Sequence, residues 1–379
     1  MIRRILVAAA FAALATPAFA DITVGFVTSL SGPGSSIGIP YQRGIQAGLA
    51  YLDTVAGHKI RLIQLDDGSD PSSATRNARK LVEEEKVDVL IGTATAPSSI
   101  AMVAVANEIK VPMISVSPIT VPAATGGERW GIAVPQPPPL MVSTVVGRMQ
   151  RDGVKNVAFI GFSDAWGDLV YDNAVKSAAV KIVTNERYAR ADTSVTAQVL
   201  KIVAARPDAV LNGGSGTQGA LPLLALAERG FKGPRYGTPA LINPDFIRVG
   251  GSAAEGILVS SGPVIVAEQL PDDHFSKKIS LAFREAHQKA NGVPTGDTFS
   301  AYSFDAWLIF TDAAKRAIEG GGEPGTPEFR KALNDAIFTT KDLVGTHAIY
   351  NFQPGQSYGV DERGLVIVRL ANGKWAYEP

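Results

Sequence analysis

The segment 212–219, NGGSGTQG, contains Gly-x-Gly-x-x-Gly, the glycine spacing of a dinucleotide-binding turn. It follows an apolar run and precedes a helix-like stretch, as such a turn does. A dinucleotide site also needs an acidic residue about twenty residues further on, to hold the ribose hydroxyls. The corresponding region, 233–244, contains no Asp or Glu. The glycines therefore favour a tight backbone turn beside a ligand, and an NAD-dependent enzyme stays open as an alternative.

Ser36 lies in the segment 34–38, GSSIG, which matches the Gly-x-Ser-x-Gly pattern of a hydrolase nucleophile elbow. A catalytic triad also needs an acid and a histidine close in space. The sequence offers four scattered histidines, which are His58, His274, His287 and His347. A polar loop explains the segment more simply, and a serine hydrolase stays open as a second enzymatic alternative.

The sequence gives little support for a metal centre. It contains no cysteine, and its histidines are far apart in the chain. The acidic segment 66–70, DDGSD, lacks a recognised ligand spacing, while Asp70 before Pro71 is typical of a helix start. We therefore expect these acids to cap the next helix, and we expect neither a metal nor another cofactor.

Hydroxyl side chains follow two predicted buried strands at the point where each strand ends. Thr95 and Ser98 come after a strand that ends at residue 92, and Ser117 and Thr120 come at the end of the next strand. The carboxyl ends of parallel strands lie at one edge of a sheet, where helix N-termini present free N–H groups. Hydroxyls and such amides form a receptor for a carboxylate, so we expect some of these residues to bind a ligand. Helix capping alone would also explain them.

Large aromatic side chains occur where the other wall of such a ligand site should lie. Trp166 follows a predicted strand within a polar turn, and Phe299 and Tyr302 come just ahead of or within a helix. Packing between lobes would account for each of them separately. Together they predict an aromatic clamp over a ligand.

The elements that must position these residues alternate along the chain. Short apolar runs rich in β-branched residues are separated by amphipathic helical stretches, a pattern typical of parallel sheets covered by helices on both faces. The predicted strands span 22–28, 60–66, 87–92, 111–117, 157–162, 181–188 and 207–214. The fold class is therefore α/β.

Three stretches interrupt the alternation, at 130–140, 257–273 and 344–355, and we expect no helix in the second. Three crossings between two lobes would make each lobe discontinuous in sequence. We expect two doubly wound parallel-sheet lobes joined by three hinge strands, with a ligand cleft between them. The expected lobe 1 is 21–136 with 265–345, and the expected lobe 2 is 137–264 with 346–379.

The first 20 residues have the features of a secretory signal peptide. A basic start precedes an apolar stretch too short to span a bilayer, and Ala18-Phe19-Ala20 is a small-x-small cleavage site. We expect cleavage after Ala20, a periplasmic location and no membrane anchor. The 36 basic residues balance the 36 acidic ones, which gives no electrostatic reason to expect nucleic acid as a partner. We expect a monomer with a small ligand.

Over nearly all of the chain after residue 20, the sequence resembles the substrate-binding proteins of ABC transporters in the leucine/isoleucine/valine-binding family, which have the type I periplasmic binding protein fold. The resemblance rests on segments such as VGFVTSLSGPGSSIG, VDVLIGTATAPSS, VPMISVSPIT, FSDAWGDL and AEGILVSSGP, in this order. It implies a non-enzymatic receptor that delivers its ligand to a membrane permease. It also implies that an aromatic residue, here Trp166, covers the ligand. The implied carboxylate contacts are Thr95, Ala96, Ser98, Ser117, Ile119 and Thr120.

The chain departs from the amino-acid binders of this family at the ammonium end. The acidic side chain that the family uses there is replaced by Pro239 or Ala240, and the segment 213–216 supplies small residues where a tyrosine is common. Burying an ammonium without a carboxylate costs several kcal/mol. We therefore expect an aromatic monocarboxylate, of arylcarboxylate or aromatic 2-oxo acid type. The other expected contacts are Ile37, Ser215, Gly216, Pro239 and Phe299.

Two further interpretations stay open at this point. A branched-chain or other aliphatic amino acid is the second candidate ligand, provided that Asp164 or Asp305 reaches the ammonium. The same architecture also serves as the ligand domain of sensory receptors, so the chain could be the partner of one.

Overall fold

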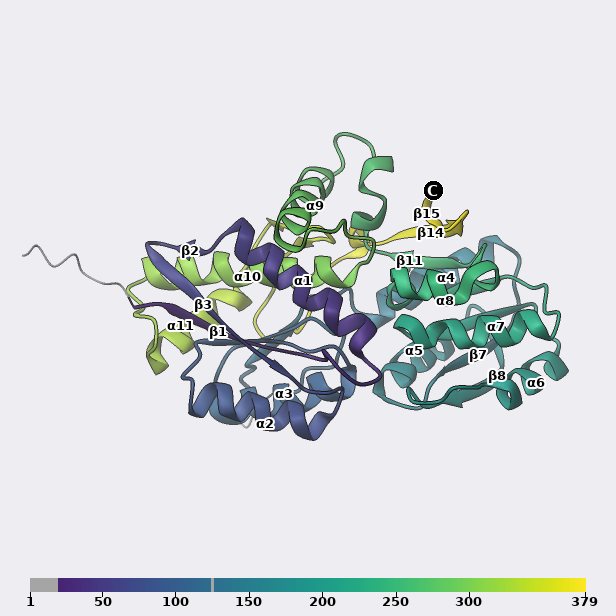
Figure 1. Ribbon diagram of the computed structural model, residues 1–379, viewed down its shortest axis with the longest axis horizontal. Coiled ribbons are helices and arrows are strands. Elements are labelled where there is room, and N and C mark those ends of the chain that lie inside the picture. Colours follow the sequence, from purple (N-terminus) through teal and green to yellow (C-terminus); the bar gives the residue numbers. More distant parts are fainter. Residues whose placement is uncertain (1–19, 124–125) are drawn as a thin grey trace, which may run out of the picture.

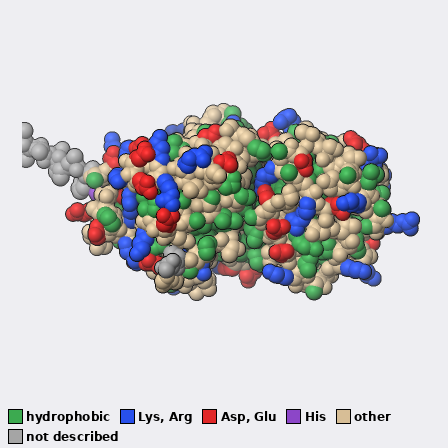
Figure 2. Space-filling model, turned by 90° about the horizontal axis from the view of Figure 1, so that it is seen from below, with side chains coloured by type: hydrophobic (Ala, Val, Ile, Leu, Met, Phe, Trp, Pro, Cys, Tyr) green, Lys and Arg blue, Asp and Glu red, His purple; other side chains and the backbone are tan. Residues whose placement is uncertain are grey.

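The computed structural model describes residues 20–123 and 126–379, which form two α/β lobes side by side (Figure 1). Each lobe is built around one sheet, and most neighbouring strands in both sheets are parallel. This confirms the expected fold class of two α/β lobes. Figure 2 shows basic and acidic side chains interspersed over one face of both lobes, as the balanced composition predicts.

Lobe 1 contains a six-stranded sheet in the order β2-β3-β1-β4-β5-β6. Its strands are β1 (Ile22–Thr28), β2 (Thr54–Val55), β3 (His58–Asp66), β4 (Val89–Gly92), β5 (Met113–Ser115) and β6 (Gly131–Ala133). Successive residues of β1 face opposite sides of the sheet. Phe26 belongs to the same hydrophobic cluster as Trp307, whereas Val27 belongs to the cluster that contains Leu81. Helices therefore cover both faces of this sheet. They are α1 (Ser35–Tyr51), α2 (Pro71–Glu83), α3 (Ala96–Ile109), α9 (Lys277–Asn291), α10 (Phe299–Glu319) and α11 (Pro327–Phe338).

Lobe 2 contains a seven-stranded sheet in the order β15-β14-β11-β10-β9-β7-β8. Its strands are β7 (Asn156–Phe162), β8 (Lys181–Tyr188), β9 (Ala209–Gly213), β10 (Arg235–Gly237), β11 (Leu258–Ser261), β14 (Val366–Ala371) and β15 (Lys374–Glu378). The helices around it are α4 (Pro138–Arg151), α5 (Ala165–Lys176), α6 (Thr196–Ala205), α7 (Leu221–Glu228) and α8 (Pro244–Ala254).

Both sheets are mixed, which the alternating pattern alone did not predict. In lobe 1, β2 pairs antiparallel with β3 across a tight turn. In lobe 2, the hairpin β14–β15 pairs antiparallel with β11 at the edge of the sheet. The expectation that 257–273 lacks a helix is wrong, because the 3-10 helix η3 (Pro263–Gln269) follows β11. Pro263 begins this helix, where its fixed φ suits the first helical position.

The chain crosses between the lobes three times, and the third crossing comes later than the sequence suggests. After the short ribbon of β12 (Leu343–Val344) and β13 (Ile349–Tyr350), residues 351–360 stay on lobe 1. There the Ser357 carbonyl accepts a hydrogen bond of 2.8 Å from the Ala133 N–H. On these contacts the third crossing lies at 361–365, whereas the expected boundary is 345/346. Gln136 in the first crossing donates to the Gly364 carbonyl in the third, at 2.6 Å.

Within 20–123 and 126–379, none of the helices combines the length and the apolar character needed to cross a bilayer. The sequence-predicted signal peptide lies outside these residues except for Ala20, whose carbonyl contacts the His58 ring at 2.8 Å.

A candidate ligand cavity between the lobes

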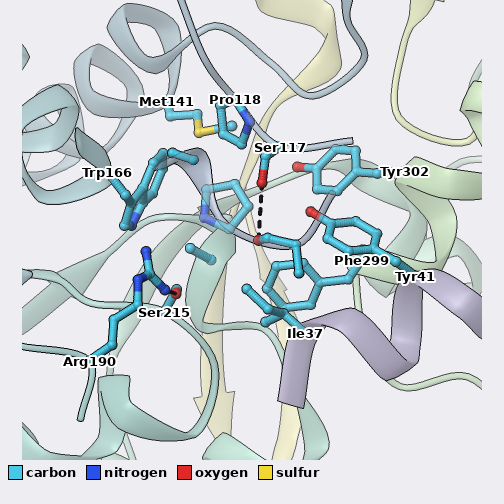
Figure 3. Close-up of a pocket in the computed structure, with 14 residues that line it drawn as sticks. Ile37, Tyr41, Ser117, Pro118, Met141, Trp166, Arg190, Ser215, Phe299 and Tyr302 are labelled. Carbon is cyan, nitrogen blue, oxygen red and sulfur yellow. Dashed lines mark hydrogen bonds between the residues drawn. The ribbon is translucent and has the colours of Figure 1, made fainter. Parts of the chain in front are cut away.

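A cavity lies where the carboxyl ends of the strands of both lobes meet, and Figure 3 shows its lining. It contains about 410 Å³ of empty space, counting the part that is open to solvent. This is the position at which open α/β sheets bind ligands. The cavity is lined by Ile37, Tyr41, Ala94, Ala96, Ser117, Pro118, Met141, Trp166, Arg190, Ser215, Pro239, Ala240, Phe299 and Tyr302.

The lobe 1 wall is polar, and the start of α3 forms part of it. Ala96 is the first residue of this helix, and Thr95 caps the helix by accepting a hydrogen bond from the Ser98 N–H at 3.3 Å. Because Pro97 has no N–H and the Ser98 N–H is bonded to Thr95, the Ala96 N–H is the donor that this helix start offers to an anion, which the helix dipole also attracts. Beside it, the Ser117 hydroxyl donates to the Ala94 carbonyl at 3.1 Å (Figure 3). This wall can hold a carboxylate.

An aromatic wall from α1 and α10 stands beside the polar one (Figure 3). Tyr41 and Phe299 meet edge to face with ring centroids 5.5 Å apart. The Tyr41 hydroxyl donates to the Val116 carbonyl at 2.7 Å, and the Tyr302 hydroxyl donates to the Gln136 side chain at 2.6 Å. Burial raises the pKa of Tyr41 and the pKa of Tyr302 far above the ordinary value, so both hydroxyls stay protonated and neutral.

Lobe 2 contributes an aromatic ring and a cation to the cavity. Trp166 lies in the first turn of α5, and its indole N–H donates to the Gly214 carbonyl at 3.3 Å. Arg190 donates from Nε to Asp164 Oδ2 at 2.6 Å and from Nη1 to Ser215 Oγ at 3.0 Å. These contacts bring the guanidinium to the wall on which Trp166 lies (Figure 3).

The glycine segment 212–219 forms a tight turn into the 3-10 helix η1 (Gly216–Ala220). A Cβ on Gly214 would lie 2.4 Å from the Tyr188 hydroxyl, and a Cβ on Gly219 would lie 2.3 Å from a Leu241 methyl group. Gly216 has a φ of +53°, in the left-handed region that favours glycine. Close packing and backbone conformation therefore account for all three glycines.

Ser36 joins the two lobes. It lies in the first turn of α1, and its hydroxyl accepts a hydrogen bond of 3.2 Å from the Thr217 N–H of lobe 2. Its carbonyl accepts a second hydrogen bond, from the Asn243 side chain of lobe 2. The structure is therefore closed over the cavity, and the GSSIG segment serves as an interlobe contact.

The structure brings seven of the twelve sequence-predicted contact residues to the cavity, namely Ile37, Ala96, Ser117, Trp166, Ser215, Pro239 and Phe299. The other five do not line it. Thr95 is a buried helix cap, and Ser98 is fully buried with a hydroxyl that has no hydrogen-bond partner within 20–123 and 126–379. Gly216 packs against Ser36.

Ile119 and Thr120 point away from the cavity. Ile119 is fully buried, and its carbonyl accepts a hydrogen bond of 2.8 Å from the Tyr358 hydroxyl. Thr120 is exposed on a separate surface depression that Tyr358 also lines. A chain segment far away in the sequence thus packs against this loop, which the strand-end rule could not anticipate.

Sequence reasoning missed Arg190, Tyr41, Met141, Ala94 and Pro118 as lining residues. Arg190 comes two residues after the end of β8, so the rule that located Ser117 could have located it. Tyr41 is in the interior of α1, where it is indistinguishable in sequence from a core residue. Its position depends on the angle at which α1 packs on α10.

Neither of the two acids suggested above as a partner for a ligand ammonium is free to bind one. Asp164 accepts from the Trp166 N–H at 2.9 Å through Oδ1 and from Arg190 through Oδ2. Asp305 is fully buried and accepts from the N–H groups of Thr346 and His347 and from the Tyr350 hydroxyl. Burial raises the pKa of Asp305 to about 6. Among the residues that the structure describes, no Asp or Glu lines the cavity.

The residues that the structure describes offer no metal site. Outside positions 1–19 and 124–125, no three His, Asp or Glu side chains are grouped so that they could hold an ion.

A family model described as a periplasmic binding protein matches residues 21–360. The chain belongs to this family. It is therefore a binding protein with the type I fold, and it is not an enzyme.

Three similar proteins illustrate the range of this family. An extracellular ligand-binding receptor from Rhodopseudomonas palustris is 38% identical, with a TM-score of 0.91 and coverage of 95% of this chain and 100% of that chain. Leu/Ile/Val-binding protein homolog 3 of Brucella melitensis is 24% identical over 88% of this chain and 89% of its own length. A solute-binding protein of an R. palustris ABC transporter, solved in complex with benzoate, shares the fold at 21% identity, with a TM-score of 0.74 and coverage of 94% and 95%.

The interlobe contact of Asn243 can be tested with a nearly isosteric change. Asn243→Asp keeps the oxygen that caps α8 through the Asp245 N–H, but it replaces the donor to the Ser36 carbonyl with a carboxylate. Because this contact exists only between closed lobes, we expect ligand affinity to fall about tenfold while the melting temperature without ligand stays unchanged. Calorimetry and thermal melts measure the two effects, with Asn243→Ser, which lacks the charge, as a milder control. Unchanged affinity in Asn243→Asp would exclude this contact from the bound form.

Proposed function

We propose that this protein binds a small aromatic monocarboxylate between its lobes, of the arylcarboxylate or aromatic 2-oxo acid type. The observation that carries the proposal is that the cavity lining offers hydrogen-bond donors and no acid. Arg190 is the charged side chain in it, and no carboxylate of the described residues faces the cavity. A ligand with a negative group is matched by such a lining, and a buried ammonium group is not.

The shape and polarity of the walls support an anion with a flat apolar body. The start of α3 offers a donor for a carboxylate, and the Ser117 hydroxyl can become a second one by turning away from the Ala94 carbonyl. Trp166, Tyr41 and Phe299 offer ring surfaces. An aromatic contact adds about 0.5–1.5 kcal/mol beyond area burial, and a hydrogen bond to a charged group adds about 1.5–3 kcal/mol. The benzoate complex of the R. palustris relative is consistent with this ligand class within the same fold.

A branched-chain or other aliphatic amino acid is the second candidate ligand. The name of the B. melitensis relative favours it. To bind the ammonium of such a ligand, one of two acids would have to give up its partners. Asp164 would have to leave Arg190 and the N-terminus of α5, or Asp305 would have to leave its three donors. Either change would leave a buried polar group without its partner, at a cost of about 1–3 kcal/mol.

A thermal-shift screen tests the proposed ligand class. Benzoate, benzoylformate, phenylpyruvate and 4-hydroxycinnamate should raise the melting temperature, because a ligand at 100 times its Kd stabilises the folded state by about 2.7 kcal/mol. Leucine, isoleucine and valine should leave it unchanged. Stabilisation by these amino acids without a response to any aromatic acid would refute the proposal.

Ligand binding would favour the closed form, which a membrane permease then recognises. A ligand shifts the balance between open and closed lobes only as far as it contacts the closed form better. The cavity meets this condition because its two polar walls come from different lobes. Delivery to a permease would thus follow from closure alone, with no bond made or broken.

We also propose that residues 1–20 are a signal peptide and that the protein acts in the periplasm. The basic start, the short apolar stretch and the Ala18-Phe19-Ala20 site support this, as does the family match, which begins at residue 21. Intact mass measurement of the protein exported by a Gram-negative host should give a chain that begins at Asp21. A chain that retains its first 20 residues would contradict the proposal.

A further inference from the structure

The Arg190 guanidinium is held in a fixed orientation. Asp164 and Ser215 accept its Nε–H and one Nη1–H, and its central carbon stands 4.1 Å from the centroid of the Phe162 ring, over which it lies. The side chain is only 15% exposed. Three contacts in different directions leave little rotational freedom, so this cation is preorganised.

The Arg190 guanidinium has donors left for a ligand. A guanidinium carries five N–H groups in one plane, and the two contacts with Asp164 and Ser215 use two of them. Nη2 donates to no protein acceptor within 20–123 and 126–379, although Arg190 lines the cavity (Figure 3). An oxygen of a bound ligand could therefore accept a hydrogen bond from it without disturbing the ion pair.

Arg190 and the carboxylate-binding wall stand on opposite sides of the cavity. Figure 3 shows Ser117 and Arg190 across from one another, with Trp166 to one side and the rings of Tyr41 and Phe299 to the other. The cavity thus has one polar end on each lobe and aromatic surface between them. A ligand with a single polar end would leave the other end unpaired, which costs about 1–3 kcal/mol.

We propose that Arg190 binds an oxygen on the ligand at the end remote from its carboxylate, so that the preferred ligands are ring-oxygenated aromatic acids. This inference rests on the proposed function. Asp164 already balances the charge of Arg190, so a neutral acceptor such as a phenolic hydroxyl satisfies the site. A second carboxylate at that end of the ligand would accept the same hydrogen bond from Arg190. Bridging from Arg190 to Ser117 also ties the lobes together, which favours closure.

The test compares matched pairs of ligands on matched variants. The pairs are benzoate with 4-hydroxybenzoate and cinnamate with 4-hydroxycinnamate, and terephthalate separates a second carboxylate from a hydroxyl. The variants are Arg190→Met, Arg190→Lys and the double change Arg190→Met with Asp164→Asn, which removes both charges and keeps a capping residue at the start of α5. Arg187→Met is the control. Arg187 also lies over two rings and pairs with an acid, but it does not line the cavity.

In the native protein, at least one oxygenated acid should bind about tenfold or more tightly than its unsubstituted partner, as expected for a hydrogen bond to a charged group. Arg190→Met and the double variant should abolish this preference, so that the two members of each pair bind within about threefold of one another. Arg190→Lys should keep part of the preference for the oxygenated acid, and Arg187→Met should keep all of it. The double variant decides the outcome if Arg190→Met does not fold.

Two results would overturn the inference. In the first, no pair shows a preference in the native protein. In the second, the Arg190 variants weaken both members of each pair equally, which would mean that Arg190 holds the carboxylate itself or only supports the wall. In both cases aromatic acids still bind, so the proposed function stands. If amino acids bind and no aromatic acid does, the proposed function fails as well.

Discussion

The ion pair between Asp164 and Arg190 sets the charge of the cavity. Asp164 stands at the start of α5, where its other oxygen caps the helix, so the carboxylate is fully engaged within the protein. Arg190 keeps donors for a ligand, and no Asp or Glu of the described residues lines the cavity. A negative or acceptor group is then the partner that the lining can satisfy, and a positive group is not. The ligand class, the role of Trp166 and the contact with both lobes all depend on this arrangement.

The topology of the sheets explains why these side chains meet. Parallel strands carry their carboxyl ends to one edge, and the two lobes face each other with these edges. Ala96 and Ser117 follow β4 and β5 of lobe 1, while Trp166 and Arg190 follow β7 and β8 of lobe 2. Residues nearly a hundred positions apart thus line one cavity. Ser36 then joins the lobes directly, since both its hydroxyl and its carbonyl accept hydrogen bonds from lobe 2. Closure is therefore supported by protein contacts as well as by a ligand.

Much of the fold could be predicted because local sequence determines it. Strand ranges such as 22–28 and 181–188 coincide with β1 and β8, since β-branched runs between helical stretches mark parallel strands, here a buried one and one at the edge of its sheet. What the sequence did not reveal depends on contacts between distant segments. Thr120 lies on a separate surface depression that Tyr358 also lines, and the third crossing comes late because Ser357 and Tyr358 still contact Ala133 of β6. Arg190 could have been found by the rule that found Ser117, but its orientation depends on Asp164 and Phe162.

The most direct test of the account uses two ligands that differ in one group. Phenylpyruvate and phenylalanine share the ring and the carboxylate, but the first has an oxo group where the second has an ammonium. Calorimetry on the purified protein should show phenylpyruvate binding at least about a hundredfold more tightly, the equivalent of roughly 3 kcal/mol, because the lining offers donors and no acid. Equal or tighter binding of phenylalanine would show that the cavity accepts an ammonium and would contradict the account.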